Sequence, residues 1–234
     1  MSTAFVSVVI PCYNEVQTIA AVVRSVLAQP DVHEVIIFDD GSQDGTSSVL
    51  DDLSEKDNRV HIGRHDKNCG KGAAIRSALS MVTGSAVIIQ DADFEYNPAD
   101  YQLLLRPIIE GRAEVVFGSR FSDAGSPRTM SLRNYVGNKL ITMLSNLCTN
   151  LRLTDIEVGL KAFRSDVLRA IELREDRFGF EPEVTAKIAK LRGVRICEVP
   201  VSYTGRTYSD GKKIGWHDGF IALWCIIKYN LIAS

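Results

Sequence analysis

The sequence predicts an α/β fold in which a mostly parallel central sheet is flanked by helices. First, short apolar runs rich in β-branched residues alternate with helical patterns along the first half of the chain, as strands and crossover helices do. Second, polar or acidic loops follow three of these runs, and open parallel sheets bind ligands at such strand ends. Third, the 234 residues are 45% hydrophobic and 24% charged, the composition of an ordinary globular protein.

The first half of the chain contains the clearest alternation. Its predicted strands are apolar runs at residues 5–10, 34–38, 60–63, 86–90 and 114–118. The helices between them have apolar residues at spacings of three and four, and we expect them at residues 16–28, 46–55, 71–81 and 98–110. This order is typical of a doubly wound sheet.

The pattern changes after Gly118. A loop over residues 119–129 precedes a long helix near 132–150. Further on, the sequence predicts a strand near 159–163, a helix at 182–191, a strand at 194–199 and a terminal helix from Trp216. Because no repeat, low-complexity tract or linker marks a boundary, we expect a single domain over residues 1–234.

The charge balance, the N-terminal residues and the apolar stretches argue against three classes of protein. Twenty-seven Lys and Arg against 29 Asp and Glu give a net charge of -2, so we expect no nucleic-acid partner. The N-terminal residues lack the charge and length of a secretory signal. The longest apolar stretch, residues 219–227, is about half of the ~20 residues that span a bilayer. We therefore expect a cytoplasmic protein without a transmembrane anchor.

Cysteine and histidine positions do not indicate a metal or disulfide framework. The five cysteines are far apart and form no CxxC motif, so we expect reduced thiols. The histidines have no ligand spacing and are expected to be structural or solvated: His33, His61, His65 and His217.

Asp91 and Asp93 directly follow the apolar run at 86–90. Two carboxylates at a sheet rim repel each other unless a cation neutralises them, and Mg²⁺ or Mn²⁺ with phosphate oxygens as further ligands meets that need. Glu95 could be a third ligand. The alternative is a set of ordinary surface carboxylates, which short acidic motifs often match.

Gly70 and Gly72 surround Lys71 where a helix is expected to begin. Such a start can bring backbone N–H groups near an anion, and the alternative is plain helix initiation with close packing. The segment is not a Walker A loop, because His65 occupies the place of the first glycine and Gly72 that of Ser or Thr. A GxGxxG fingerprint is also absent after the first strand, which argues against a nicotinamide dehydrogenase.

Five segments, in this order, resemble the family 2 glycosyltransferases with the GT-A (Rossmann-like) fold. They are VVIPCYNE (8–15), DDGSQDGT (39–46), NCGKGA (68–73), DAD (91–93) and GSR (118–120). Within that family the chain is most similar to the polyprenyl-phosphate sugar transferases, such as the dolichol-phosphate mannosyltransferases. The resemblance extends from about Phe5 to Tyr229.

The resemblance implies that residues 1–118 bind a nucleoside-diphosphate sugar, either a GDP- or a UDP-hexose. In the family, the first segment holds the nucleoside, an aspartate of the second bonds the base or ribose, and the DxD pair holds the diphosphate through a divalent cation. Glu95 stands where the dolichol-phosphate mannose enzymes have a glutamine that also meets the metal, so the donor sugar stays open. The donor-binding residues implied are Pro11, Tyr13, Glu15, Asp39, Asp40, Lys71, Asp91, Ala92, Asp93, Arg206 and Lys212.

The resemblance also implies that residues 119–234 bind the acceptor. Arg120 and Arg133 match arginines that meet the acceptor phosphate, and Arg128 lies between them. The segment RTYSDGKK (206–213) resembles a basic mobile loop that closes on the donor phosphates. The implied catalytic residues are Asp91, Asp93, Arg120, Arg133 and Asp155.

The chemistry of the acceptor agrees with this assignment. A hydroxyl acceptor needs a carboxylate base, whereas a phosphomonoester is already an anion near neutral pH. Family members acting on hydroxyls commonly carry a Glu-Asp pair before a helix, and this chain has TDIEVG (154–159) there, similar to the Asp-x-x-x-Gly segment of the lipid-phosphate enzymes. Asp155 as a base stays an alternative.

We therefore expect metal-dependent, inverting transfer of a hexose to a dolichyl or undecaprenyl phosphate, with peripheral attachment at the cytosolic membrane face. One alternative is a hydroxyl acceptor with Asp155 or Glu157 as base. The other is a protein that binds nucleotide sugars without turnover.

Two helices have apolar residues whose surroundings the sequence leaves open. For the long helix we expect core packing, with contact to a lipid as the alternative, for Leu140, Ile141, Met143, Leu144 and Leu147. For the terminal helix we again expect core packing, with an in-plane membrane helix as the alternative, for Trp216, Phe220, Leu223, Trp224 and Ile227.

Overall fold

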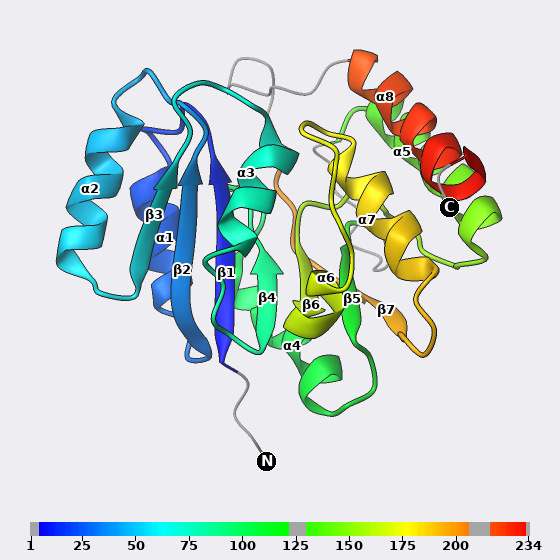
Figure 1. Ribbon diagram of the computed structural model, residues 1–234, viewed down its shortest axis with the longest axis horizontal. Coiled ribbons are helices and arrows are strands. Elements are labelled where there is room, and N and C mark those ends of the chain that lie inside the picture. Colours follow the sequence, from blue (N-terminus) through cyan, green and yellow to red (C-terminus); the bar gives the residue numbers. More distant parts are fainter. Residues whose placement is uncertain (1–4, 122–129, 206–215, 233–234) are drawn as a thin grey trace.

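The computed structural model describes residues 5–121, 130–205 and 216–232 (Figure 1). Its centre is a seven-stranded sheet with the order β3-β2-β1-β4-β6-β5-β7. All neighbouring strands are parallel except β6, which is antiparallel to both β4 and β5. The strands are β1 (Val6–Cys12), β2 (Val32–Asp39), β3 (Val60–Arg64), β4 (Ala86–Ile89), β5 (Val115–Ser119), β6 (Lys161–Arg164) and β7 (Ile196–Pro200). The predicted mostly parallel α/β sheet is confirmed.

Helices cover both faces of the sheet, with α3 in front of it and α1 behind it in Figure 1. Every predicted helix is present, with ends shifted by a few residues. The short helix α6 was not predicted, because five residues are too few to establish a helical period. The helical elements are α1 (Ile19–Leu27), α2 (Thr46–Lys56), α3 (Lys71–Leu79), η1 (Pro98–Asp100), α4 (Tyr101–Ile109), α5 (Leu132–Thr149), α6 (Ser165–Arg169), α7 (Phe180–Ala189), α8 (Trp216–Ile227) and the π-helical turn η3 (Lys228–Ile232).

The central strands are apolar along their whole length because both faces are covered. Val8, Val9 and Ile10 of β1 are all fully buried, and so are Val35 to Ile37 of β2. This explains why the sequence shows continuous apolar runs rather than alternation. The strand order and the parallel pairing place the carboxyl ends of β2, β1 and β4 side by side at one edge of the sheet, the upper edge in Figure 1.

Helices α5, α7 and α8 pack against one another at one side of the molecule (Figure 1). The core packing predicted for the apolar residues of α5 and α8 is largely wrong. Ile141 does pack against the core and Leu223 is half-buried, but the others that can be described are exposed: Leu140, Met143, Leu144, Leu147, Phe220, Trp224 and Ile227. The side chain of Trp216 lies outside the described part. Within the described ranges, no helix is both long and apolar enough to cross a bilayer.

Glu114, immediately before β5, is expected to contribute stability that depends on pH. Its carboxylate accepts hydrogen bonds from the side chain and the backbone N–H of Arg195 (2.7 Å to the backbone nitrogen), and these bonds lower the pKa of Glu114 to about 2. A lowered pKa gives stability that is complete above the unfolded-state pKa of about 4.5 and is lost as the pH falls towards 2.

We predict that Glu114→Gln lowers the free energy of unfolding at neutral pH by about 1–2 kcal/mol, a value reduced because Arg195 is largely exposed. Denaturant unfolding of both proteins should show this difference shrinking as the pH falls below about 4. Glu172→Gln, at an exposed ion pair, is the matched control and should change little. A difference that stays constant down to the acid limit would contradict the prediction.

Candidate active site

The turns after β1, β2 and β4 are joined by hydrogen bonds into one unit. The backbone N–H of Asn14 donates to Ser42 Oγ (2.9 Å), and Asn14 Oδ1 accepts from the N–H of Gln43 (2.8 Å). The hydroxyl of Thr18 lies 2.8 Å from Glu15 Oε2 and 2.9 Å from the carbonyl oxygen of Ala92. The three strand ends singled out from the sequence therefore form one continuous surface.

Asp39 and Asp40 are both buried at the end of β2. Asp39 accepts from the backbone N–H of Ser42 (3.0 Å) and from the hydroxyl of Ser47 (2.5 Å). Because internal donors already occupy both carboxylate oxygens, these contacts shape the turn. The nucleoside of a sugar donor would have to share Asp39 with Ser42 and Ser47.

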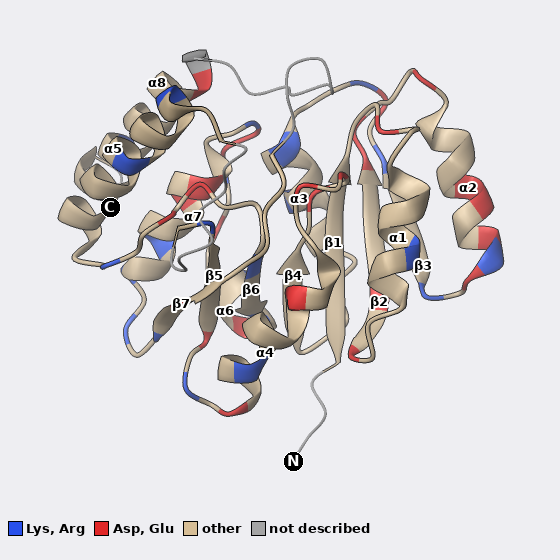
Figure 2. Ribbon diagram, turned by 180° about the vertical axis from the view of Figure 1, so that it is seen from behind, with Lys and Arg blue, Asp and Glu red and all other residues tan. Residues whose placement is uncertain are grey.

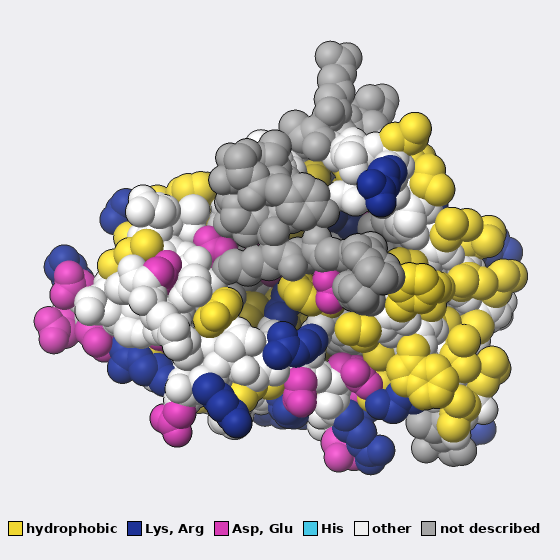
Figure 3. All heavy atoms as spheres, turned by 90° about the horizontal axis from the view of Figure 1, so that it is seen from above, with side chains coloured by type: hydrophobic (Ala, Val, Ile, Leu, Met, Phe, Trp, Pro, Cys, Tyr) yellow, Lys and Arg dark blue, Asp and Glu magenta, His cyan; other side chains and the backbone are white. Residues whose placement is uncertain are grey.

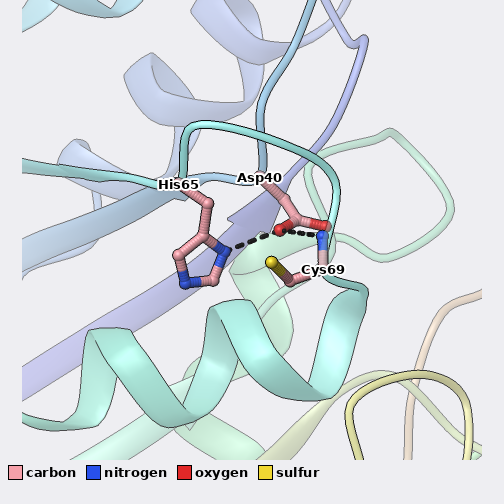
Figure 4. Close-up of side chains that lie close together, drawn as sticks. All are labelled: Asp40, His65 and Cys69. Carbon is pink, nitrogen blue, oxygen red and sulfur yellow. Dashed lines mark hydrogen bonds and ion pairs between the residues drawn. The ribbon is translucent and has the colours of Figure 1, made fainter.

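Asp40, His65 and Cys69 come close enough together to resemble a metal site, with ligand atoms within 4.8 Å of one another (Figure 4). However, Asp40 accepts from His65 Nδ1 (2.7 Å) and from the backbone N–H groups of Cys69 (2.9 Å) and Gly70 (2.7 Å). His65 Nε2 is paired with Ser77 Oγ (3.0 Å). These hydrogen bonds hold the loop before α3, and His65 takes part in them through both ring nitrogens.

The glycines around Lys71 pack closely against the loop at residues 175–177. A Cβ on Gly70 or Gly72 would collide with the carbonyl oxygens of Asp176 or Glu175, respectively. Gly70 also has a φ of 108°, which favours glycine. The alternative of helix initiation with close packing therefore accounts for both glycines.

Lys71 lies between two acidic side chains. Its Nζ is 2.9 Å from Asp91 Oδ1 and 2.9 Å from Glu181 Oε1. Burial opposes the charge of Lys71, but Asp91 and Glu181 outweigh it and raise the lysine pKa. Burial likewise opposes ionisation of Asp91, and the charge of Lys71 outweighs it and lowers the aspartate pKa. Lys71 thus holds Asp91 as a carboxylate.

Gly159 provides the space that the Asp91 carboxylate occupies. A Cβ at this position would lie well inside the contact distance of Asp91 Oδ2, and the backbone N–H of Gly159 donates to Tyr96 Oη (2.9 Å). We predict that Gly159→Ala displaces Asp91 and lowers activity by about 10²-fold or more. Gly111→Ala is the control for loss of a glycine. An added Cβ meets no atom there, and the φ of 65° gives only the backbone cost of alanine. Near-normal transfer by Gly159→Ala would contradict the prediction.

Asp93 and Glu95 lie in the turn that follows Asp91. Asp93 Oδ1 accepts from the backbone N–H of Glu95 (2.9 Å), and Glu95 Oε1 accepts from the Tyr203 hydroxyl (3.3 Å). The three carboxylates of this turn, Asp91, Asp93 and Glu95, are an all-oxygen set of the type that hard divalent cations prefer. The chemistry of these ligands therefore fits Mg²⁺ or Mn²⁺, although among the described residues the group with ligand atoms within 4.8 Å of one another is Asp40, His65 and Cys69 and not these three carboxylates.

Arg120 and Asp155 form a buried bidentate ion pair. Arg120 Nε is 2.7 Å from Asp155 Oδ2 and Arg120 Nη2 is 2.8 Å from Asp155 Oδ1, with side-chain exposures of 9% and 0%. Asn138 of α5 donates a third bond to Asp155 Oδ1 (3.0 Å). Burial opposes ionisation of Asp155, but the Arg120 charge and these bonds outweigh it and lower the pKa. This geometry favours Asp155 as the support of Arg120 over Asp155 as a base.

Tyr203 connects the Arg120 pair to the acidic turn. The Arg120 guanidinium lies 5.1 Å from the centre of the Tyr203 ring, and the hydroxyl of the same tyrosine donates to Glu95. Tyr96 packs on Tyr203 with ring centres 5.3 Å apart. Tyr203 thus links Arg120, which is expected to bind the acceptor phosphate, to the carboxylates expected to bind the donor.

Glu157 and Glu181 each have a buried side-chain oxygen and lie within electrostatic reach of Lys161. Burial and the neighbouring Glu181 carboxylate raise the pKa of Glu157 to about 8, whereas burial lowers the pKa of Lys161 to about 8. Glu157 Oε1 and Glu181 Oε2 are buried atoms without a hydrogen-bond partner in the part of the chain described. Burial and the Glu181 carboxylate thus favour the protonated form of Glu157.

The remaining predicted residues are more dispersed. Pro11, Tyr13 and Glu15 are partly buried at the end of β1, and Ala92 is buried within the acidic turn. Arg133 is exposed at the start of α5. Outside the described residues lie Arg128, Arg206, Lys212 and Lys213.

Sequence reasoning did not single out Tyr96, Tyr203, Lys161 or Glu181 as site residues. Tyr203 follows β7 and meets the acidic turn through an isolated bridge with Tyr96 and a hydrogen bond to Glu95, which no local pattern indicates. Glu181, in the first turn of α7, matches ordinary helix-start chemistry. The one available signal in the sequence was Lys161, because a basic residue at the start of an apolar strand is unusual and could have indicated a site residue.

Comparisons with known proteins show what the chain is similar to. The sequence model of "Glycosyl transferase family 2" matches residues 7–172. Polyprenol monophosphomannose synthase of Mycolicibacterium smegmatis is 31% identical, over 89% of this chain and 80% of its own. UDP-N-acetylglucosamine–dolichyl-phosphate N-acetylglucosaminyltransferase of Methanococcus voltae is 30% identical, over 99% of this chain and 98% of its own.

Solved structures share the fold at lower identity. Glucosyl-3-phosphoglycerate synthase from Mycobacterium tuberculosis, in complex with uridine diphosphate, superposes with a TM-score of 0.77 at 18% identity, over 99% of this chain and 82% of its own. The same enzyme with Mn²⁺, uridine diphosphate and phosphoglyceric acid gives 0.73 at 20% identity, over 99% and 80%.

Proposed function

The chain belongs to glycosyl transferase family 2, and we propose that it transfers a hexose from a nucleoside-diphosphate sugar to a polyprenyl phosphate. Family membership and the GT-A fold, both expected from the five sequence segments, are confirmed. The protein is therefore an enzyme, a glycosyltransferase, with relatives named for transfer to polyprenol, undecaprenyl or dolichyl phosphate. The proposal concerns the donor, the acceptor and the residues that bind them.

The observation that carries the proposal is the buried Arg120–Asp155 pair beside the acidic turn. A buried arginine held by a carboxylate presents its remaining N–H groups in a fixed direction, which suits recognition of a phosphate. A phosphate acceptor needs such a positioned cation and needs no base. The two oxygens of Asp155 are already bonded, so Asp155 is suited to position the Arg120 cation and not to act as a base.

In this proposal residues 1–118 bind the donor and residues 119–234 the acceptor. Tyr13, Glu15 and Asp39 meet the nucleoside. A divalent cation held by Asp91, Asp93 and Glu95 would offset the negative charge of the leaving nucleoside diphosphate. Lys71 keeps Asp91 ionised for that role, and Arg206 and Lys212 are proposed to close on the donor phosphates.

The acceptor phosphate oxygen attacks the anomeric carbon of the sugar from the face opposite the diphosphate. The new carbon–oxygen bond forms as the bond to the diphosphate breaks, so the configuration inverts. No proton has to be removed from the nucleophile, because a phosphomonoester is ionised near neutral pH. Arg120 and Arg133 orient that anion by charge-assisted hydrogen bonds.

A second candidate is transfer to a hydroxyl acceptor. The observation that favours it is Glu157, because a buried carboxyl group with its pKa raised to about 8 has the properties of a general acid or base. A structural neighbour has been solved with phosphoglyceric acid, although the likeness to it concerns the fold alone. In that case Glu157→Gln would abolish turnover.

The test is a transfer assay with UDP- and GDP-hexoses, with and without a short polyprenyl phosphate, and with free monosaccharides as competing acceptors. We expect product from the lipid phosphate and none from the monosaccharides. Robust transfer to a hydroxyl, together with an inactive Glu157→Gln variant, would establish the second candidate instead. Binding of the donor with no product from any acceptor would contradict both.

Arg133 allows a more specific prediction about the acceptor. It is exposed at the first turn of α5, so its removal should leave the fold intact. We predict that Arg133→Ala raises the acceptor KM by about 10-fold, the loss of one charge-assisted bond, and leaves the affinity for the nucleoside diphosphate unchanged. Arg106→Ala, equally exposed on α4, is the control. Unaltered acceptor kinetics would remove Arg133 from the proposed site.

A further inference from the structure

Helix α5 has its polar residues inside and its apolar residues outside. The residues that it buries are Asn138, Thr142 and Ser145, at spacings of four and three, the spacings of one helix face. Asn138 donates to Asp155, and Thr142 Oγ1 accepts from the N–H of Ile156 (3.3 Å). This inner face therefore supports the catalytic segment. An ordinary surface helix has the opposite arrangement.

The outer face of α5 is a continuous apolar stripe. Its side chains recur at helical spacing, and those at the two ends, Leu132 and Leu147, are 76% and 74% exposed. The stripe consists of Leu132, Val136, Leu140, Met143 and Leu147. Five large apolar side chains on one exposed helix face are far more than the scattered singles normal on protein surfaces.

A second stripe lies on α8 and the turn η3, which pack beside α5. Phe220 and Leu231 at its ends are 65% and 72% exposed. Its members are Phe220, Trp224, Ile227 and Leu231, again at helical spacing. We call the two stripes together the α5–α8 apolar face. Figure 3 shows hydrophobic side chains gathered on this side of the molecule.

We infer that the α5–α8 apolar face lies on a lipid bilayer that contains anionic lipid, with both helices parallel to its surface. Neither helix can span the hydrocarbon layer, but an exposed apolar helix face can enter the interfacial region. Trp224 of α8 and Tyr135 of α5, both exposed, are residues that membrane interfaces favour. The choice of a bilayer as the occupant rests on the proposed lipid acceptor.

The charges of α5 favour an anionic surface over a second copy of this chain. Its eighteen residues contain Arg133 and Lys139 and no carboxylate (Figure 2). Two copies paired through this helix would bring like charges together, whereas helix pairs normally place opposite charges beside their apolar seam. Anionic head groups attract such residues.

The α5–α8 apolar face is also continuous with the proposed acceptor site. A surface hollow beside α5 is lined by Lys139, Met143, Leu147, Arg152 and Thr154. Lys139 Nζ donates to the carbonyl oxygen of Thr154 (3.1 Å), and Thr154 directly precedes Asp155. A lipid chain that enters from the bilayer would therefore follow α5 towards the segment that holds Asp155.

Vesicle binding by the full chain tests the inference. Co-sedimentation should show binding to phosphatidylcholine mixed with phosphatidylglycerol, and weaker binding to phosphatidylcholine alone or at high salt. Of the two tryptophans, Trp216→Phe leaves only Trp224, whose fluorescence emission should shift to the blue on the mixed vesicles. Failure of the wild-type chain to bind either kind of vesicle would overturn the inference.

Matched variants locate the contact. Leu140→Glu combined with Leu231→Glu, one leucine from each stripe and neither lining the hollow, should weaken binding to mixed vesicles by about tenfold or more for each leucine. Leu103→Glu, exposed on α4, should leave it unchanged. Equal binding by both variants would overturn the inference, as would a dimer, measured by sedimentation equilibrium, that the paired substitution dissolves.

Transfer to a short, water-soluble polyprenyl phosphate separates this inference from the proposed function. The paired variant should retain that activity, because its substitutions lie outside the proposed catalytic residues, and should lose transfer to a long-chain acceptor in vesicles. If the wild-type chain transfers to the short acceptor but ignores vesicles, the membrane inference fails and the proposed function stands. If it binds vesicles without any transfer to lipid phosphate, the proposed function fails.

Discussion

Replacing Asp93 by alanine is expected to lower the rate of sugar transfer about 10³-fold, or about 4 kcal/mol of transition-state stabilisation. Asp93 lies in the turn after β4, between Asp91 and Glu95, where we propose that the divalent cation binds. It is a better choice than Asp91, because removing Asp91 would also release Lys71 from its ion pair. The Asp93 variant therefore tests the cation without disturbing the Lys71 ion pair, at the cost of one hydrogen bond from the backbone of Glu95.

The measurement has two parts. Initial rates at saturating donor should fall, and calorimetry with the nucleoside diphosphate present should show weaker binding of Mn²⁺. Asp52→Ala, which removes an exposed carboxylate from α2, is the matched control for the loss of one negative charge. Full activity of the wild-type enzyme in excess chelator would contradict the cation assignment.

The fold could be predicted because parallel strands covered on both faces produce apolar runs that alternate with helices. The position of β6 could not. This strand follows α5 in the sequence, yet it lies antiparallel between β4 and β5. Pairing between segments so far apart depends on the packing of the whole sheet, and four residues contain no local signal for it.

The candidate site divides in the same way. Asp91 and Asp93 could be predicted because acidic residues directly after a buried strand must lie at the sheet edge. Tyr203 could not, since it reaches Glu95 by tertiary contact alone. The core packing expected for α5 was wrong for a related reason. Helical spacing shows that a helix has an apolar face but does not show whether protein, lipid or water meets that face.

Arg120→Ala is expected to have the largest effect on stability, about 3–5 kcal/mol in the free energy of unfolding, because it leaves the fully buried Asp155 without its cation. Urea unfolding at neutral pH measures this. Arg64→Ala, at an exposed ion pair with Asp51, is the control and should cost about 0–1 kcal/mol. A similar small cost for both variants would show that Asp155 does not depend on Arg120.

Asp155→Asn separates a support for Arg120 from a catalytic base. Asparagine can still accept one hydrogen bond from Arg120, so a supporting role predicts a raised acceptor KM, a loss of about 1–3 kcal/mol in unfolding free energy, and a turnover number within about tenfold of wild type. A base predicts the reverse, a turnover number lowered by about 10²–10⁴-fold with stability nearly intact. Because Arg120 lowers the Asp155 pKa, a base at this position would be a weak one. We therefore expect the KM and the stability to change together while turnover persists.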